Sequence, residues 1–286
     1  MSKVRGVPKV PVLVVAVVAL AAGTASAQQA LDRATALRAA ADALGMVRWS
    51  DIGAGTTRLP GIDVVNTMEF WASGTIDSGG RAMKAEYHAA LGYNPAAMRV
   101  ETTTGGTGAA AQRTIQTVRE PFAWDESEIG AGLVPGKGTA TPAMAALRER
   151  ALLLWTLPYG VVKAALAAGE KTTVSRESGA TIVTFPLDGV LAGVTVRATL
   201  DAGNLITRVE TRPDNAALTA LATVTEYSNY ADRAEVLTDI KTPGRIVRKQ
   251  GGRTVIDIEV KKWETNNLYL VFPVPSNVKA AATPSR

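Results

Sequence analysis

The chain has 286 residues, with 31 lysines and arginines, 26 aspartates and glutamates, one histidine and no cysteine. The lack of cysteine excludes disulfides, a thiolate nucleophile and a cysteine-ligated zinc site. A single histidine cannot supply the two or three imidazole ligands of a typical hydrolytic metal centre. We therefore expect neither a metal nor a cofactor.

The first 27 residues have the pattern of a secretory signal peptide. Three basic residues precede an apolar run over residues 11–22, and Ala25-Ser26-Ala27 follows as a small-x-small cleavage site. The apolar run is too short to cross a hydrocarbon core of ~30 Å comfortably. We expect cleavage after Ala27, a periplasmic location and no stable membrane span afterwards; the alternative is an uncleaved anchor.

Removing this segment changes the charge balance. It carries three of the 31 basic residues and no acidic one, which leaves 28 basic against 26 acidic residues. The basicity of the whole chain is thus mostly a targeting feature, and a clustered basic face for nucleic acid is not indicated.

An amphipathic helix is predicted first in the exported part. Leucines and alanines recur at three- and four-residue steps from Leu31 to Leu44, and Gly45 ends the run. Short β signals separated by glycine-rich turns follow. The strands expected in this part cover residues 82–87, 98–103 and 113–118.

A second helical region is expected over residues 141–168. Thr141 is a suitable N-cap, with Pro142 in the first turn. Pro158 interrupts the pattern, so a shorter second helix should restart there and end at Gly169.

The rest of the chain is predicted to be almost wholly β. The segments 201–204 and 250–253 are short hairpin turns, which require antiparallel neighbours. Residues 278–286 are small and polar, and we expect a flexible tail there. The predicted strands cover residues 181–185, 194–200, 205–211, 222–227, 244–249, 254–260 and 268–272.

These elements predict an α+β fold that is mainly β. We expect a large curved antiparallel sheet, an open half-barrel, with the N-terminal helix and the helix pair packed on its concave side. No repeat or linker divides the sequence, so residues 28–277 are expected to form a single domain.

Residues that could carry catalysis are few. Ser78 lies in an Asp-Ser-Gly-Gly segment, but no histidine precedes it as in chymotrypsin-type proteases. His88 fits an ordinary strand position. Asp125, Glu126 and Glu128 cluster after a tryptophan, but aromatic sugar platforms and a calcium-loop motif are missing, so solvated loop acids are the simpler interpretation.

Aromatic residues are spread over the predicted sheet and helices. A strongly curved sheet covered by helices can enclose a lined cavity between the two layers. The alternative for each aromatic residue is ordinary core packing. The predicted cavity lining consists of Trp155 and Tyr159 from the helix pair, with Trp71, Phe185 and Trp263 from sheet or loops.

Five stretches carry a family resemblance: residues 154–165, 183–189, 204–211, 243–252 and 271–278. Together they resemble an uncharacterised exported bacterial domain that precedes metallo-β-lactamase-fold hydrolase domains. The His-x-His-x-Asp-His motif of that hydrolase is absent here, so its activity does not carry over. In element order the chain is also similar to the lipoprotein-carrier superfamily, whose half-barrels have an apolar concave face plugged by helices. That similarity implies binding of an acyl chain.

Three functions remain open. The leading hypothesis is a periplasmic, non-enzymatic domain that binds a lipid-like or other apolar ligand between sheet and helices. The second is an interaction module that docks a separate hydrolase or another envelope protein. The third is an unrecognised hydrolase that uses Ser78, Asp125 or Glu126.

Overall fold

The computed structural model describes residues 32–47, 50–51, 56–57, 65–106, 111–232 and 240–282. The predicted signal peptide, residues 1–27, lies outside these ranges. Within them, no helix is both long enough and apolar enough to cross a membrane.

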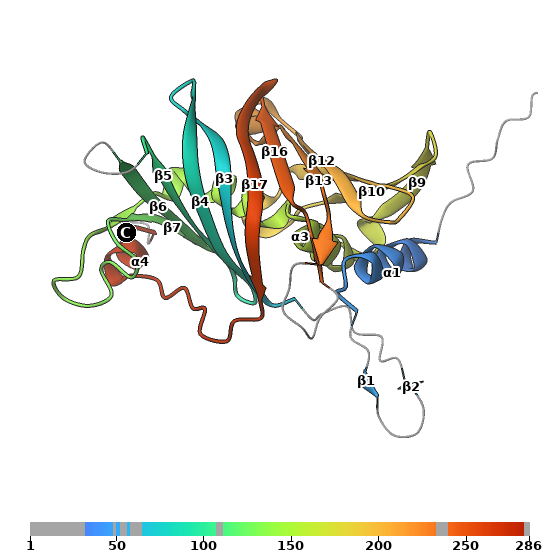
Figure 1. Ribbon diagram of the computed structural model, residues 1–286, viewed down its shortest axis with the longest axis horizontal. Helices are drawn as coiled ribbons and strands as arrows, with labels where there is room; N and C mark the ends of the chain where they lie inside the picture. The colour runs from blue at the N-terminus through green and yellow to red at the C-terminus, as the bar shows by residue number, and fades with distance from the viewer. Residues whose placement is uncertain are drawn as a thin grey trace, which may run out of the picture.

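One antiparallel sheet of 13 strands dominates the molecule, and it is not closed into a barrel (Figure 1). Its order is β8-β7-β6-β5-β4-β3-β17-β16-β13-β12-β11-β10-β9. The strands of the first half are β3 (Thr67–Ser78), β4 (Arg81–Tyr93), β5 (Ala96–Thr104), β6 (Gln112–Arg119), β7 (Phe122–Glu126) and β8 (Ala140–Pro142). Those of the second half are β9 (Thr173–Glu177), β10 (Ala180–Pro186), β11 (Val194–Leu200), β12 (Ile206–Pro213), β13 (Thr223–Ser228), β16 (Arg245–Gln250) and β17 (Arg253–Thr265).

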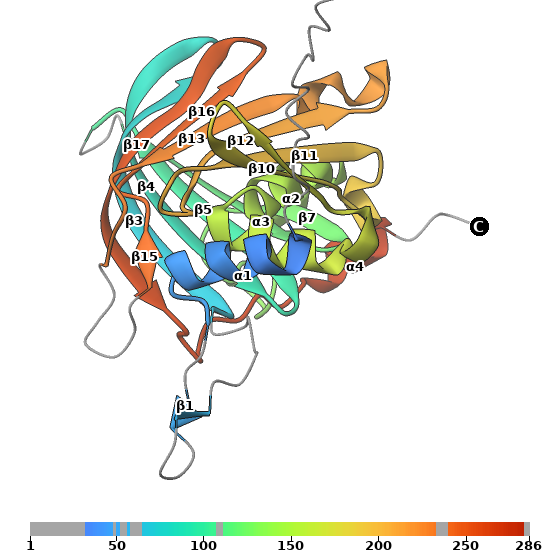
Figure 2. The ribbon, with the colours of Figure 1, turned by 90° about the vertical axis from the view of Figure 1, so that its right-hand side faces the viewer.

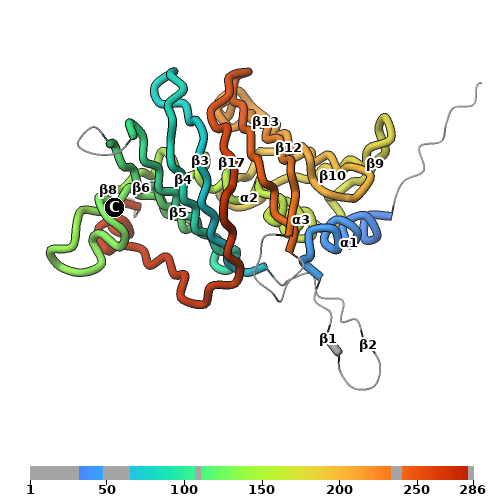
Figure 3. The backbone as a smooth tube through the Cα atoms, viewed as in Figure 1, coloured from blue at the N-terminus to red at the C-terminus, as the bar shows by residue number. Residues whose placement is uncertain are grey.

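Each half is a meander, in which consecutive strands of the large sheet lie side by side (Figure 3). The halves join at one seam, where β17 pairs with β3 from Ile256↔Ile76 to Thr265↔Met68. Two short hairpins lie outside the large sheet: β1 (Ser50–Asp51) with β2 (Thr56–Thr57), and β14 (Ala231–Asp232) with β15 (Lys241–Thr242).

Three helices cover the concave face of the sheet (Figure 2). They are α1 (Arg33–Ala43), α2 (Leu147–Trp155) and α3 (Pro158–Ala167). The carboxylate of Asp32 caps α1 by accepting from the Thr35 backbone N–H at 2.9 Å, and Gly45 follows the helix with a φ of 72°. Pro158 takes the first position of α3, where its missing N–H costs nothing.

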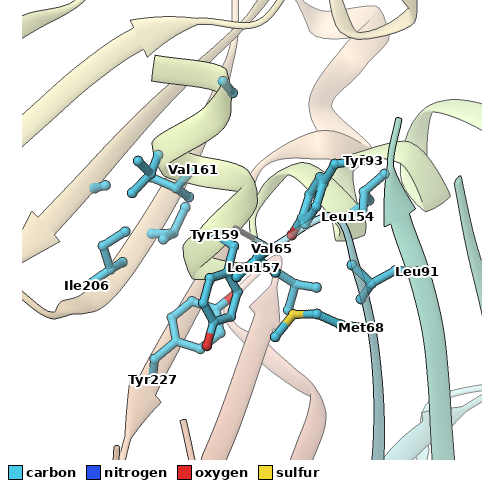
Figure 4. Close-up of a cluster of buried hydrophobic side chains, with 14 of the residues drawn as sticks. Val65, Met68, Leu91, Tyr93, Leu154, Leu157, Tyr159, Val161, Ile206 and Tyr227 are labelled. Atoms are coloured by element: carbon cyan, nitrogen blue, oxygen red, sulfur yellow. The ribbon is translucent and has the colours of Figure 1, made fainter. Parts of the chain in front are cut away.

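Alternation along the strands separates the two faces of the sheet. On β3, Met68, Phe70 and Ala72 are buried against the helices, while the residues between them point to the convex face. The helix pair packs into this core through Leu154, Leu157 and Tyr159 (Figure 4). The predicted class, an α+β half-barrel with helices on its concave side, is confirmed.

The C-terminal segment differs from the prediction. The expected strand over residues 268–272 is wrong: this stretch has no strand structure, and Leu268 and Tyr269 are each 91% exposed. The segment runs along the convex face of the first half, where Phe272 packs on Ala90 and Ala97. It ends in α4 (Ser276–Ala282), which packs on β7 and β8 with Val278 fully buried. Residues 278–282 are therefore helical and not a flexible tail.

The start of the helix pair is also corrected. Thr141 and Pro142 belong to β8, and α2 begins at Leu147 after a short 3-10 turn at Met144–Ala146. β8 is an edge strand, where a proline removes no ladder hydrogen bond, so the apparent N-cap signal is a strand end instead.

Candidate functional site

A cavity of about 480 Å³ lies between α2 and the concave face of the sheet. It is formed at the hairpin ends of β3, β5, β6, β16 and β17, on the side of the sheet that α2 covers. α3 and α1 instead pack toward β9 and β10 and take part in the core there. A site of this volume falls in the range of about 300–1,000 Å³ that is usual for small-molecule pockets.

The inner wall of the cavity is apolar. Tyr87, Met98 and Val100 project from the sheet, and Leu153 faces them from α2. Tyr87 and Met98 are each at most 5% exposed, so this wall continues directly into the core. A ligand that reaches this wall exchanges water for hydrocarbon contacts, and the free energy gained is about 25 cal/mol per Å² of apolar surface buried.

The mouth of the cavity is polar. Alternate residues of β6 point inward here, and the Thr102 and Thr114 hydroxyls of neighbouring strands are hydrogen-bonded at 2.6 Å. The polar residues of this region are Ser78, Thr102, Thr104, Gln112, Thr114, Gln116 and Gln250. The cavity as a whole is therefore amphipathic, with hydroxyl and amide groups outside and hydrocarbon inside.

Three arginines line the cavity, and two of them are held in ion pairs. Arg150 of α2 binds Asp125 at 2.5 Å and donates to the backbone oxygens of Thr117 and Trp124. Arg253 pairs with Asp77 across the seam. Both charges are thus compensated by the protein itself.

The third arginine, Arg248 of β16, is 5% exposed and lies where the apolar wall begins. Its Nη1 donates to the Thr156 hydroxyl at 3.1 Å. Burial lowers the pKa of the Arg248 guanidinium, and the nearby Tyr227, Glu149 and Tyr87 oppose this. Arginine nevertheless stays protonated in proteins, so the site holds a buried positive charge.

A recess of about 20 Å³ continues from the inner wall toward the core. It shares Tyr87, Met98, Leu153 and Arg248 with the main cavity. Burial raises the pKa of both Tyr87 and Tyr227 well above that of free tyrosine, so both phenols are neutral. The recess is too small for more than about one water-sized group, and it therefore marks the inner limit of the site.

The five aromatic residues predicted to line a cavity do not line either of these spaces. Trp71 lies on the convex face, where it stacks on His88 at 4.6 Å between ring centroids, and the Lys262 ammonium lies 4.7 Å from the centroid of its ring. Trp155 is half-buried at the end of α2, where its indole N–H donates to Glu120 at 2.7 Å. Burial raises the pKa of Glu120, and the Trp155 hydrogen bond opposes this.

The other three aromatic residues belong to the main core. Tyr159 is fully buried in the core cluster (Figure 4). Its hydroxyl donates to the Lys241 backbone oxygen at 2.5 Å. Phe185 is also fully buried, and Trp263 lies against Phe70 at 4.5 Å between ring centroids. The structure brings Tyr159 and Phe185 into the same core cluster as Trp263.

The residues considered for catalysis are also dispersed. Ser78 lines the cavity mouth, whereas His88 lies on the opposite face of the sheet beside Glu69, at 3.3 Å. Asp125 is paired with Arg150. Glu126 is buried and accepts hydrogen bonds from neighbouring groups. No described histidine can therefore act on Ser78 as a general base.

Comparison with known proteins finds similarity to solved structures. No family model matches the chain, and no curated protein matches it. Among solved structures, the chain is similar to a domain from Vibrio parahaemolyticus that is described as an outer membrane lipoprotein-sorting protein domain. The TM-score is 0.46 at 8% identity, over 82% of this chain and 93% of that one. A similarity at this level says nothing about function, and the expected likeness to a domain preceding metallo-β-lactamase-fold hydrolases stays a prediction.

The sequence does contain a pattern for the cavity residues, but it lies in alternating polar residues and not in the aromatic residues on which the prediction relied. Gln112, Thr114 and Gln116 are polar at alternate positions of one strand, and Val118 continues the same face with an apolar side chain. Such a change along one face of a strand is typical of a wall that passes from solvent into a core. Arg248 gives a second signal, because an arginine follows Ile246 on the inward face of β16, where an apolar residue is usual.

Proposed function

We propose that this protein is a non-enzymatic binding domain for an apolar or lipid-like small molecule, carried in the cavity between α2 and the concave sheet. The observation that carries the proposal is the cavity itself, with a volume of about 480 Å³ and an inner wall of core-like side chains. The wall is part of the sheet, so the site is formed before any ligand arrives.

The N-terminal sequence adds a location to this proposal. A basic start, an apolar run and an Ala-x-Ala ending support export to the periplasm with cleavage after Ala27. In that compartment, a soluble carrier would shield the hydrocarbon part of its ligand from water. The intact mass of the protein recovered from a periplasmic extract tests the location: a form that begins at Gln28 supports it, and a membrane-retained full-length form contradicts it.

The binding function is tested on the full chain expressed with its signal and purified from a periplasm. Native mass spectrometry, followed by solvent extraction, should release a small apolar species on denaturation. The purified protein should also bind the neutral dye phenylnaphthylamine with a rise in fluorescence. A clean mass without adduct, together with no dye binding, would rule the proposal out.

A pair of variants on β6 ties the dye signal to the cavity. Thr114→Trp places a large ring in the cavity mouth, while Arg113→Trp places the same ring on the opposite face of the same strand. Thr114→Trp should weaken dye binding by at least about tenfold, because the inserted ring occupies ligand volume. Arg113→Trp loses only its exposed pair with Glu101 and should bind as the parent does.

A further inference from the structure

The charge on Arg248 is the least compensated of the three in the cavity. Its guanidinium donates a hydrogen bond to a neutral hydroxyl, that of Thr156. In the described part of the chain, no carboxylate oxygen lies within 4.0 Å of its guanidinium. Arg150 and Arg253, by contrast, each have an aspartate partner.

Burying an arginine in this position costs desolvation free energy. Removing an ion from water costs several kcal/mol unless a counter-charge and hydrogen bonds replace the solvent. Glu149 attracts Arg248 from α2, but it is exposed and does not form an ion pair with it. The guanidinium has five N–H donors in a planar fork, and those not engaged by Thr156 can serve a group inside the cavity.

The surroundings of Arg248 define the rest of the ligand. Tyr87, Met98 and Leu153 line both the cavity and the recess together with Arg248. A molecule that contacts the guanidinium must therefore also lie against hydrocarbon. A small inorganic anion would satisfy the charge and leave this wall uncovered, whereas a neutral alkane or alcohol would cover the wall and leave the charge uncompensated.

We propose that the ligand is an amphiphilic organic anion, with its acidic group on the Arg248 guanidinium and its hydrocarbon part against Tyr87, Met98 and Leu153. This proposal rests on the proposed function and specifies its ligand class. A carboxylate or phosphate oxygen pair matches the planar fork of arginine in a two-point hydrogen bond. Specificity for the anion then comes from one buried residue.

The first measurement compares three compounds on the full chain by isothermal titration calorimetry below their aggregation limits. Decanoate carries both features, decanol only the chain, and inorganic phosphate only the charge. Decanoate should bind at least about tenfold more tightly than decanol, because charge-assisted hydrogen bonds in a desolvated site are strong. Phosphate should bind more weakly than decanoate by a similar factor.

The second measurement uses a matched pair of variants. Arg248→Met keeps an unbranched side chain and removes the charge, while Arg245→Met makes the same change at an exposed position of the same strand, outside the cavity, where the arginine pairs with Asp257. Arg248→Met should lose the preference for decanoate over decanol and keep phenylnaphthylamine binding. Arg245→Met should keep the preference.

The outcomes separate this proposal from the one on which it rests. Dye binding with equal affinities for decanoate and decanol would overturn the anion site and leave the binding function in place. Absence of dye, decanol and decanoate binding would overturn both. If Arg248→Met fails to fold, the comparison of the three compounds on the unmodified protein still decides the question.

Discussion

At the scale of one residue, Glu126 was predicted to be a solvated loop acid. Its carboxylate is instead buried and holds neighbouring groups by hydrogen bonds. Its Oε1 accepts from the Thr117 hydroxyl at 2.8 Å and from the Trp124 indole N–H at 2.9 Å. Its Oε2 accepts from the Gly130 backbone N–H at 2.7 Å. Because Glu126 is 8% exposed, these bonds replace its hydration, and they fix the loop that follows β7.

Glu126→Gln should lower the free energy of unfolding by about 1–3 kcal/mol. The amide can keep its oxygen toward Thr117 and Trp124, but its NH₂ group then faces the Gly130 N–H, and two donors meet. Urea denaturation followed by circular dichroism measures the change. Glu128→Gln is the control, because Glu128 is exposed two residues further on, and its effect should stay within about 0.5 kcal/mol. Equal effects from the two variants would contradict the structural role of Glu126.

Trp71 was predicted to line a cavity, and the structure places it on the convex face of the sheet. Trp71 breaks the apolar alternation of its strand, because Phe70 before it and Ala72 after it face the core. Its ring is instead covered on the convex face by His88 and Lys262. These partners come from β4 and β17, and a contact between three strands cannot be seen in a local pattern.

At the scale of elements, the break at Pro158 was predicted and the close contact beside it was not. Gly160 lies in the first turn of α3, and a Cβ atom added there would be 2.5 Å from the Leu154 backbone oxygen and 3.1 Å from the Trp155 Cα. The absence of a side chain at residue 160 thus lets α3 begin directly against the end of α2. This corner also holds Thr156, the hydrogen-bond partner of Arg248.

Gly160→Ala should therefore lower the free energy of unfolding by about 1–3 kcal/mol, the usual cost of forcing an extra methyl group into a packed site. Differential scanning calorimetry should show the loss as a lower Tm. Leu166→Ala is a suitable comparison on the same helix, because Leu166 is 38% exposed and its truncation opens no closed core space. A Gly160→Ala variant as stable as the parent would mean that the corner relaxes without cost.

Most strands and the two central helices were predictable, because periodicity and turns are local. Hairpin turns such as 201–204 determine their own antiparallel neighbours. Residues 268–272 were predicted as a strand because they are apolar, but a strand also needs a partner, and Phe272 packs on the sheet face instead. The predicted cavity lining consisted of aromatic residues, whereas the walls of the observed cavity include inward-facing polar residues of β6 and an arginine of β16. Only the assembled sheet brings these two strands around one space.

At the scale of the whole molecule, the β3–β17 seam is the one strand pairing that joins the two meanders among the described residues. Gly74 of β3 lies in this seam, and a Cβ atom added there would lie 2.1 Å from the Asp257 backbone oxygen and 2.8 Å from the Ile258 Cα. The two strands are thus nearer at this point than any side chain at residue 74 permits.

Gly74→Ala should weaken both halves together. We expect hydrogen exchange to accelerate at the slowest amides of β5 and of β12 alike, because opening the seam exposes the core that both halves share. Ser73→Ala, on the convex face of the same strand, should leave those rates nearly unchanged. Acceleration limited to β3 and β17 would show that the halves are stable separately.

The seam also determines the order in which the strands can pair as the chain is synthesised. Strands β4 to β8 can pair soon after they leave the ribosome, because each neighbour is close in sequence. β3 must wait for its other neighbour until residues 253–265 have emerged, and these lie far along the chain from β3. Until then, its outer row of backbone N–H and C=O groups is an open template for any other extended chain. β17 therefore covers this edge of β3 and joins the two halves of the sheet.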